Sequence, residues 1–296
     1  MSKILLLGCG GLGGQLAARL IAAKHRVIGV KRSPLKEALT GLQLVMVDIT
    51  RASEVAEIPT AVDLVIVLLS PGERNKAAYQ ELYQDGIANV LAHFSKASGQ
   101  GPRPRWLMVS STSVYAQNAG EWVDEASPTL AQSFNGEALI GAEQQLWAHS
   151  GASTVVRFSG IYGPGRESLV RRVREGRPLQ YGPAYYSNRI HEQDCLGILC
   201  FLIDRALAGL PLETLYLASD SAPVPLAEVA GWLSEQLACS PPPATLSHTS
   251  SGAMNKRCRN SRLLNLGYVL RYRTYREGYG DLFERGLVSG DALPGA

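Results

Sequence analysis

The sequence has little of what marks a membrane protein or a nucleic-acid-binding protein. None of the apolar runs in its 296 residues approaches the roughly 18 residues that a membrane-spanning helix needs, and residues 1–7 lack the long apolar region of a signal peptide. Charged residues make up only 19% of the chain, and a net charge of +3 does not favour nucleic acid as a partner. We therefore expect a cytoplasmic enzyme or small-molecule-binding protein, with neither a membrane nor a nucleic acid as its partner.

Cysteine is also scarce. The five cysteines are an odd number and lack the spacing of metal ligands: Cys9, Cys195, Cys200, Cys239 and Cys258. Disulfides are typical of secreted proteins, so reduced thiols packed in a cytoplasmic protein are the interpretation we favour. We expect no metal site.

Glycines, by contrast, cluster near the beginning of the chain in KILLLGCGGLGGQLAARL, residues 3–20. The apolar run 4–7 suits a buried strand, and an apolar-periodic helix follows the glycines. Gly8, Gly10 and Gly13 fit the spacing G-x-G-x-x-G, which permits a tight turn, close approach to a pyrophosphate and close packing of helix and strand. The pattern predicts a dinucleotide site, although glycine-rich turns without a ligand also occur. Its expected loop residues are Gly8, Gly10, Gly11, Leu12 and Gly13.

Strand-like and helix-like runs alternate along most of the chain, which is typical of a doubly wound parallel sheet. The predicted strands are 4–7, 26–30, 44–47, 64–69, 106–110, 154–158 and 215–218. The predicted helices are 16–23, 53–56, 75–96, 139–149, 168–175, 194–207 and 227–237. Loops are expected at 99–104 and at the stretch 240–251, which is rich in Pro, Ser and Thr. Residues 1–160, completed by about 189–218, would form the dinucleotide-binding domain, and 161–188 with 219–296 a small substrate-binding region.

The end of the second predicted strand indicates which dinucleotide binds, because this position meets the adenosine ribose. NAD enzymes usually place an acid there, whereas a basic residue accommodates the 2′-phosphate of NADP. Lys31 and Arg32 follow this strand and the first acid beyond them is Glu37, so NADP is favoured over NAD. Alternatively, the basic pair belongs to a solvated loop.

Three more residues complete the predicted cofactor site. Asp48, after the third predicted strand, is placed to meet the adenine, although an exposed acid at a strand end is an equal alternative. Leu69 ends the fourth predicted strand and Ser70 follows it.

Several segments together resemble the short-chain dehydrogenase/reductase superfamily: GCGGLGG at 8–14, VSSTSVY at 109–115, VVRFSGIYGPGR at 155–166 and NRIHEQD at 188–194. Segments 120–128 and 255–268 are similar to its extended or atypical branch of NAD-dependent epimerases and dehydratases. The resemblance implies a Rossmann sheet of about seven strands with a small C-terminal substrate domain. It also implies that helices of the sheet domain, here 75–96 and 139–149, can form a homodimer.

The usual chemistry of that superfamily needs a serine, an asparagine, and a tyrosine four residues before a lysine on one helix face. The ammonium lowers the pKa of the tyrosine, whose phenolate moves a proton while a hydride goes to or from the nicotinamide. Ser111 matches the serine. Aligned on Ala142 and Glu143, the chain has Asn135 and Leu139 where the tyrosine and lysine belong. No other register supplies the pair, because there is no tyrosine in 116–161 and no lysine between Lys96 and Lys256.

Other residues must therefore move the proton if the protein is an enzyme. The candidate catalytic residues are Ser111, Tyr115, Asp124, Glu125 and His191. Each has a structural alternative: Tyr115 packs on the cofactor, Asp124 and Glu125 cap a helix near Ser127, and His191 is a hydrogen-bonded structural residue.

Three functions remain open from the sequence. The first is an NADP-dependent oxidoreductase or epimerase acting on a small carbonyl or sugar-like substrate with a non-standard acid. The second is an NADP-binding sensor or regulatory protein without turnover, which the missing tyrosine and lysine favour. The third is an epimerase or dehydratase that recycles bound NAD on a nucleotide sugar.

Two sets of arginines have separate expectations. Arg157 lies in an apolar strand, so its charge should be paired, for example with Asp194. The other arginines either bind an anionic substrate or form a solvated helix face: Arg166, Arg171, Arg172 and Arg174.

Overall fold

The computed structural model describes residues 1–97, 103–182, 184–245 and 255–288. The loops predicted at 99–104 and 240–251 lie partly outside these described residues. The chain divides into two compact units. Unit 1 comprises Met1–Val114, Thr129–Arg157 and Leu196–Tyr216, and unit 2 comprises Tyr115–Pro128, Phe158–Cys195 and Leu217–Ala296. Residues 115–128, counted with residues 1–160 in the sequence, thus belong to unit 2.

Unit 1 is built around a seven-stranded parallel sheet with the order β11-β7-β5-β4-β1-β2-β3. The strands are β1 (Lys3–Leu7), β2 (Arg26–Lys31), β3 (Leu42–Met46), β4 (Leu64–Val67), β5 (Arg105–Ser111), β7 (Ser153–Phe158) and β11 (Leu215–Ala218). The helices are α1 (Gly11–Ala22), α2 (Lys76–Gln80), α3 (Ile87–Lys96), α4 (Phe134–His149) and α6 (Glu192–Leu207). Short helical turns are η1 (Val55–Glu57), η2 (Glu81–Gly86) and η3 (Thr112–Val114).

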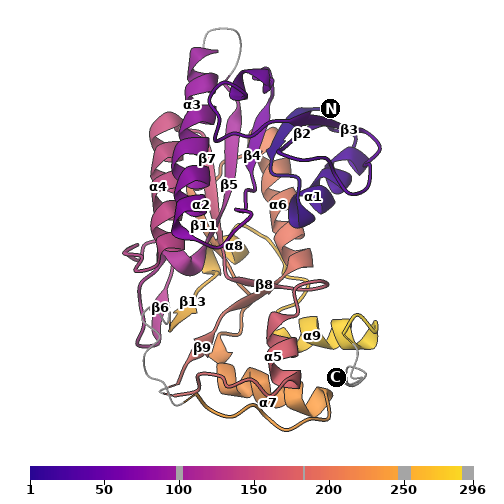
Figure 1. The fold of residues 1–296 in the computed structure, drawn as a ribbon, viewed down its shortest axis with the longest axis vertical. Coiled ribbons are helices and arrows are strands. Elements are labelled where there is room, and N and C mark those ends of the chain that lie inside the picture. Colours follow the sequence, from indigo (N-terminus) through magenta and orange to yellow (C-terminus); the bar gives the residue numbers. More distant parts are fainter. Residues whose placement is uncertain (98–102, 183, 246–254, 289–296) are drawn as a thin grey trace. The chain divides into compact units, whose positions relative to one another are not determined.

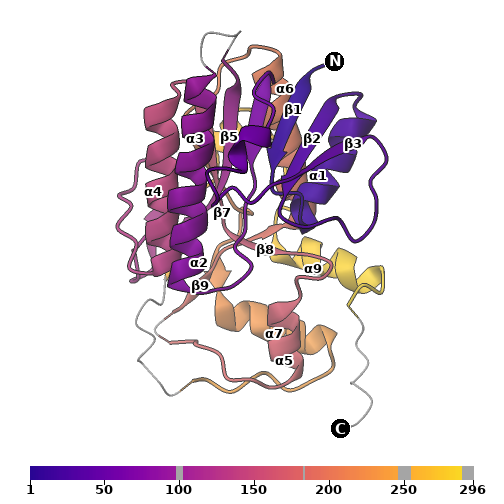
Figure 2. The same ribbon diagram turned by 45° about the horizontal axis from the view of Figure 1, so that its top comes forward.

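Apolar side chains on both faces of the strands explain this sheet. All residues of β4 and β7 are buried, as expected for strands covered by helices on two sides. The helices α2, α3 and α4 lie together on one face, and α1 and α6 lie on the other, where Arg19 hydrogen-bonds Cys200 (Figures 1 and 2). The doubly wound Rossmann fold predicted from the sequence is confirmed.

Residues 75–96, predicted as one helix, are interrupted in the middle by a π-helical stretch. The six residues of η2 form π-helical turns between α2 and α3. Tyr83, in this stretch, donates its hydroxyl to the carbonyl oxygen of Leu69 at 2.8 Å. Asn75 caps the beginning by accepting a hydrogen bond from the amide of Ala78. The widened turn therefore ties the helix to the segment after β4.

A buried ion pair links β7 to α4. Arg157 donates from Nε and NH2 to the two oxygens of Glu143, at 3.0 and 2.5 Å, and the two side chains are 4% and 1% exposed. Ser110 of β5 donates to the same carboxylate at 2.5 Å. The expectation that Arg157 is paired is confirmed, but the suggested partner, Asp194, is wrong. Glu143 has the position because its helix packs directly over the central strands.

Unit 2 contains three two-stranded pairings, in which β8 pairs with β10, β9 with β12 and β6 with β13. The strands are β6 (Glu121–Val123), β8 (Gly160–Tyr162), β9 (Tyr186–Ser187), β10 (Arg189–His191), β12 (Val224–Pro225) and β13 (Lys256–Cys258). The helices are α5 (Ser168–Arg174), α7 (Leu226–Gln236), α8 (Ser261–Asn265) and α9 (Tyr275–Glu284). None of the helices in the described parts of the chain combines the length and apolar character needed to cross a membrane.

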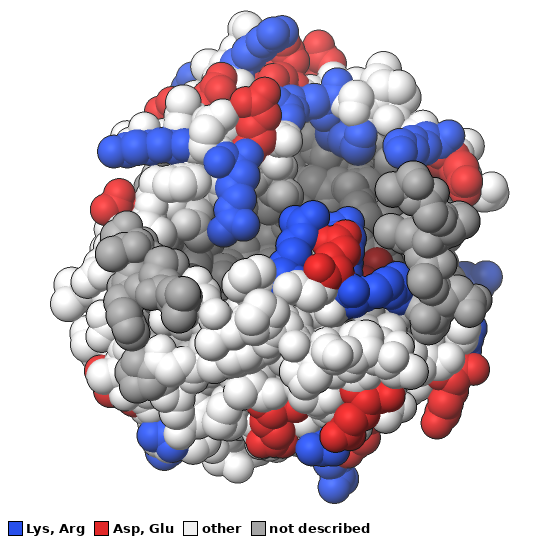
Figure 3. Space-filling view, turned by 60° about the horizontal axis from the view of Figure 1, so that its bottom comes forward, with Lys and Arg blue, Asp and Glu red and all other residues white. Residues whose placement is uncertain are grey.

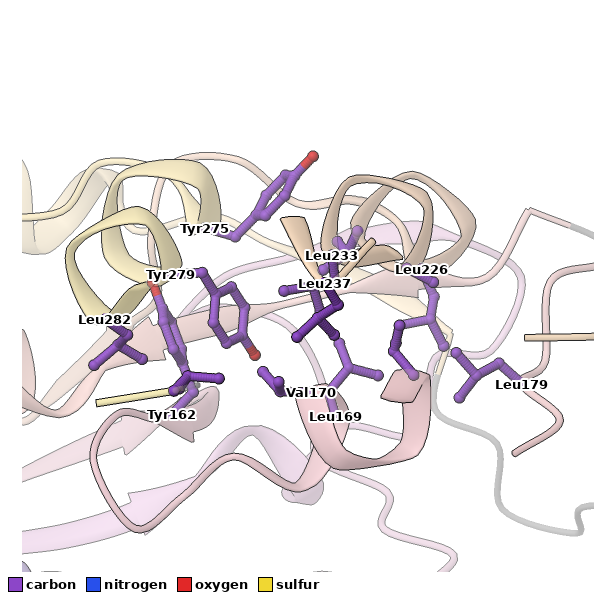
Figure 4. Packing of buried hydrophobic residues seen from close by; sticks show 14 residues of the cluster. Tyr162, Leu169, Val170, Leu179, Leu226, Leu233, Leu237, Tyr275, Tyr279 and Leu282 are labelled. Carbon is purple, nitrogen blue, oxygen red and sulfur yellow. The ribbon is translucent and has the colours of Figure 1, made fainter. Parts of the chain in front are cut away.

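The core of unit 2 gathers side chains from α5, α7, α9 and β8 (Figure 4). Leu169 of α5 and Leu233 of α7 contribute aliphatic surface, and Leu282 of α9 is fully buried. Tyr162 of β8 stacks on Tyr279 of α9 with ring centroids 4.3 Å apart. Unit 2 therefore has an apolar core of its own.

Asp194, which does not pair with Arg157, holds the segment 268–272 by hydrogen bonds. Its carboxylate accepts hydrogen bonds from the amides of Arg271 and Tyr272, at 2.7 and 3.0 Å, and from the Tyr268 hydroxyl at 3.1 Å. Burial raises the pKa of Asp194, and these donors oppose that rise. Asp194 is thus a structural residue of unit 2.

Removing one partner of the Arg157–Glu143 pair should destabilise the protein by about 3–5 kcal/mol, because the other charge would stay buried and unpaired. We expect this for Arg157→Met, measured as the free energy of unfolding in urea. The matched control is Arg51→Met, which breaks an exposed pair with Glu54 and should have a much smaller effect. Equal losses in the two variants would contradict the assignment.

Candidate functional site

The turn between β1 and α1 has the geometry that the glycine spacing predicts. Gly8 has φ +100°, a conformation that favours glycine, and a Cβ added there would overlap the carbonyl oxygen of Leu68 after β4. A Cβ added at Gly13 would overlap the carbonyl oxygen of Gly8. These two glycines therefore let three backbone segments approach closely.

Gly10 differs from both neighbours because a Cβ added there would meet nothing within 4 Å. It precedes α1, whose first turn receives no side-chain cap. The first N–H groups of the helix, at Gly11 and at Leu12, which is 4% exposed, have no partner within the helix. Such a helix start, beside open space, suits an anionic group. The strand order also reverses here, between β1 and β4, where ligands bind in doubly wound sheets.

Cys9 lies within this turn as a packed thiol. It is 1% exposed, and a Cβ on Gly29 of β2 would overlap its sulfur. Burial raises the pKa of the Cys9 thiol to about 11, so it is protonated and unreactive at neutral pH. All five cysteines are free thiols.

The two basic residues after β2 have different surroundings. Lys31 donates from Nζ to the Ser33 hydroxyl at 2.7 Å and to the Ser33 carbonyl oxygen at 3.1 Å, which folds it onto its own loop. The exposed Arg32 makes no hydrogen bond or ion pair with the described residues, and Gly72 after β4 lies beside its guanidinium. Arg32 is thus the basic group that is free to bind a ligand.

The remaining predicted cofactor residues lie near the same edge of the sheet. Asp48 accepts hydrogen bonds at Oδ1 from the amide and hydroxyl of Thr50, at 3.1 and 2.8 Å, so one carboxylate oxygen is used in a turn. The carbonyl of Leu69 is used by Tyr83, and Ser70 is exposed.

Ser111 ends β5, and α4 begins against the turn that follows it. The Ser111 hydroxyl accepts a hydrogen bond from the amide of Ser113 at 3.1 Å. A Cβ on Gly136 of α4 would overlap the Ser113 carbonyl oxygen, so neighbouring Asn135 lies close to this turn. Leu139 is 5% exposed and belongs to the core. The two positions that should hold tyrosine and lysine are therefore occupied by an amide and a core leucine.

Tyr115 and Asp124, both in unit 2, lie together but in structural hydrogen bonds. Tyr115 is fully buried and donates its hydroxyl to the carbonyl oxygen of Asp124 at 2.8 Å. Asp124 accepts at Oδ1 from the amide of Ala126 and from the Ser127 hydroxyl, at 3.0 and 3.1 Å. No helix begins near Ser127; the carboxylate closes a turn instead.

Glu125 is likewise engaged within unit 2. It accepts a hydrogen bond from the amide of Leu217 at 2.8 Å and lies 3.8 Å from Arg262, with its side chain 4% exposed. Its role as a proton carrier stays a prediction, as does that of Tyr115 and Asp124.

His191, the last candidate, is 1% exposed at the end of β10. Its Nδ1 accepts a hydrogen bond from the amide of Gln193 at 3.1 Å, so the proton of the neutral ring is on Nε2, which has no partner among the described residues. The ring contacts Tyr162 and Tyr272, with centroids 5.1 and 4.3 Å away. Burial lowers the pKa of His191 to about 4, which keeps it neutral.

Two buried ionisable residues escaped the sequence analysis. Burial raises the pKa of Asp220 to about 7, and its Oδ2 has no partner among the described residues. Burial lowers the pKa of Lys256 to about 8. Asp220 follows an apolar strand and could have been noticed, whereas nothing around Lys256 in the sequence signals burial.

The arginines of segment 166–174 divide between two environments. Arg172 donates to the carbonyl oxygen of Pro178 at 2.7 Å. Arg166, Arg171 and Arg174 line a hollow of about 330 Å³ together with Glu167. On the face in Figure 3, acidic and basic side chains are interspersed among the described residues. Both the anion-binding and the solvated interpretation therefore remain.

Adding a methyl group at two of the glycines should separate folding from ligand binding. Gly13→Ala should destabilise the protein by about 1–3 kcal/mol through overpacking. Gly10→Ala should leave the urea midpoint unchanged, since its backbone suits alanine and space is free. Gly10→Ala should still weaken binding of a dinucleotide in a fluorescence titration. Unchanged binding in Gly10→Ala would contradict the site.

The buried neutral His191 should make stability fall in acid. Its pKa is lowered from the unfolded value of about 6.5 to about 4, so its contribution is complete above pH 6.5 and is lost as the pH falls toward 4, by up to about 3 kcal/mol. Unfolding free energies of wild type and His191→Phe between pH 7 and 4 check this. A variant with the same acid-dependent loss as wild type would count against a buried neutral imidazole.

Comparison with known proteins agrees with this geometry. The model of the NAD dependent epimerase/dehydratase family matches residues 4–180. Comparison with the curated proteins finds no match.

Three solved structures illustrate the similarity. A protein from Methylobacillus flagellatus, provisionally assigned as an NAD-dependent epimerase/dehydratase, is 34% identical, with a TM-score of 0.79 and coverage of 96% of this chain and 98% of that chain. A functionally unknown conserved protein from Silicibacter pomeroyi is 26% identical, with a TM-score of 0.72 and coverage of 97% and 99%. Human epimerase family protein SDR39U1, solved with NADPH, is 19% identical, with a TM-score of 0.72 and coverage of 95% and 99%, and shares the fold. The family match and the 34% identity over nearly the whole chain confirm the predicted resemblance: this protein belongs to the NAD-dependent epimerase/dehydratase family.

Proposed function

We propose that the protein binds NADP and is an oxidoreductase or epimerase acting on a small carbonyl or sugar-like substrate. The observation that carries this proposal is the β1–α1 turn, in which Gly8 and Gly13 hold the backbones together while Gly10 leaves space beside an uncapped helix. A bound nicotinamide dinucleotide would supply hydride transfer.

The described residues offer partners for the pyrophosphate, the 2′-phosphate and the adenine of such a cofactor. The N–H groups at the start of α1 would hold the pyrophosphate, and Arg32 would pair with the 2′-phosphate. Asp48 has an oxygen available for the adenine, since its described hydrogen bonds use only Oδ1 and the amide. Ser70 is exposed after β4, where the sheet order reverses. Two proteins of this fold were solved with different dinucleotides: SDR39U1 with NADPH, and MoeE5, which is 21% identical to this chain with a TM-score of 0.75, with NAD.

The acid–base part of the reaction has to differ from the superfamily pattern. Asn135 cannot become a phenolate, and Leu139 has no charge to lower a neighbouring pKa. Ser111 has a hydroxyl that can donate to a substrate oxygen while it accepts from Ser113. We keep Ser111 as the residue that would orient a carbonyl group.

A second candidate function is cofactor binding without turnover. It is favoured by the structural hydrogen bonds of Tyr115, Asp124, Glu125 and His191, which leave none of them as an evident proton carrier. A third, recycling of bound NAD on a nucleotide sugar, is suggested by MoeE5, solved with UDP-glucose and NAD. Free Arg32 favours NADP over that alternative.

One experiment separates these functions. Wild-type protein is titrated with NADPH and with NADH by fluorescence, and NADPH loss is then followed over a panel of carbonyl compounds. Turnover supports the enzyme, whereas tight binding without turnover supports the sensor. NAD released when the purified protein is denatured would support the recycling enzyme. We also propose a cytoplasmic location, which the free thiols support.

Arg32→Ala should weaken NADPH binding about tenfold or more, because a charge-assisted pair with the 2′-phosphate is lost. NADH lacks that phosphate, so its affinity should not change. Arg26→Ala, at the other end of β2, is the matched control and should alter neither titration. An equal loss for both dinucleotides, or none for NADPH, would refute the assignment of Arg32.

A further inference from the structure

Lys256 is the buried lysine of this protein. The chain has seven lysines, all described, and the other six are partly or fully exposed. Lys256 is 2% exposed, and its Nζ donates to the carbonyl oxygen of Tyr115 at 3.2 Å. An ammonium has three N–H groups, so that bond leaves two unused.

The backbone that carries Lys256 is fixed on both sides. The Asn188 side chain donates to the Lys256 carbonyl oxygen at 2.7 Å and accepts from the Cys258 amide at 2.7 Å. The preceding residue, Asn255, accepts at its carbonyl from the amide of Gly120 at 2.8 Å. Because β13 also pairs with β6, the ammonium is held in one place in unit 2.

The charge of Lys256 has no counter-charge among the described residues. No carboxylate of the described residues pairs with Lys256. Burial is the main cause of its lowered pKa, and the neighbouring Cys258 is the lesser, opposing one. The adjoining segment 246–254 contains neither Asp nor Glu. Arg157, the buried cation of unit 1, has both oxygens of Glu143. Burying a cation costs free energy unless it is paired, so an unpaired one needs a reason.

Lys256 is nevertheless mostly charged at neutral pH. Burial lowers its pKa to about 8, which leaves the protonated form dominant at pH 7. The hydrogen bond to the Tyr115 carbonyl oxygen uses one N–H group of that ammonium and supplies no negative charge to balance it.

We propose that the Lys256 ammonium, fixed by the Tyr115 carbonyl and the Asn188 clamp, binds an oxyanion group, carboxylate or phosphate, of the protein's ligand. This inference rests on the proposed function in taking that ligand to be the substrate. It identifies the substrate as an anion and gives unit 2 a role in binding it.

The test is an NMR titration of the full chain labelled with [13Cε]lysine. Lys256 is assigned by the signal lost in Lys256→Met, and Lys96→Met, on the surface of α3, is the matched control. The pH titration is run in sodium chloride and then, at equal ionic strength, with acetate or with inorganic phosphate.

In chloride, we expect one lysine signal to titrate near pH 8. One of the two anions should raise the pKa of this signal in a saturable way, while the pKa values of the other six lysines stay unchanged. A rise of one pKa unit corresponds to about tenfold tighter binding of the anion to the charged than to the neutral lysine. The acetate arm indicates a carboxylate ligand and the phosphate arm a phosphorylated one. A Lys256 signal that neither anion moves overturns the proposal.

Two results keep this inference distinct from the proposed function. Lys256→Met should retain the NADPH affinity of wild type, since it lies outside the β1–α1 turn. If the wild-type protein binds no dinucleotide, the proposed function is wrong, but the anion titration still tests the Lys256 site. If Lys256→Met does not fold, the wild-type signal remains recognisable by its low pKa, and an ordinary pKa for all seven lysines overturns the inference.

Discussion

Close approach of three backbone segments at the end of β1 is the constraint on which the rest of unit 1 depends. Gly8 brings the turn against the residue after β4, and Gly13 brings α1 against that same turn. A larger residue at Gly8 would push the turn away from the segment after β4, and one at Gly13 would push α1 away from the turn. The same closeness leaves the first N–H groups of α1 directed at open space beside Gly10, so one packing requirement produces both the fold and a place for an anion.

The buried charged groups differ in how completely they are paired. In unit 1, Arg157, Glu143 and Ser110 satisfy one another, and the network joins β7, α4 and β5. In unit 2, Asp194 is also satisfied, by three donors, but Lys256 has a single carbonyl oxygen as its described partner and Oδ2 of Asp220 has no partner among the described residues. A saturated network serves stability, whereas unsaturated buried charges are typical of places where a ligand completes the set.

The family relationship explains the cofactor turn better than it explains catalysis. The chain retains the serine at position 111 and the glycine turn, yet the helix that should carry tyrosine and lysine presents Asn135 and the buried Leu139. The acids suggested by the sequence as substitutes hold turns and strand ends together. Binding of a dinucleotide and turnover of a substrate are therefore separate questions for this protein, and the hydrogen bonds of unit 2 bear on the second.

The sequence by itself determined the sheet, the order of its strands and helices, and the glycine turn. Apolar runs bury strands such as β4 and β7, and glycine spacing acts over a few residues, so both are readable locally. The sequence motifs were also enough to identify the family. Only the tertiary structure decided that Arg157 meets Glu143, that Asp194 holds segment 268–272, and that Lys256 is buried. The reason is physical: such partners lie far apart along the chain, and their meeting depends on how helices pack on strands, which no local pattern records.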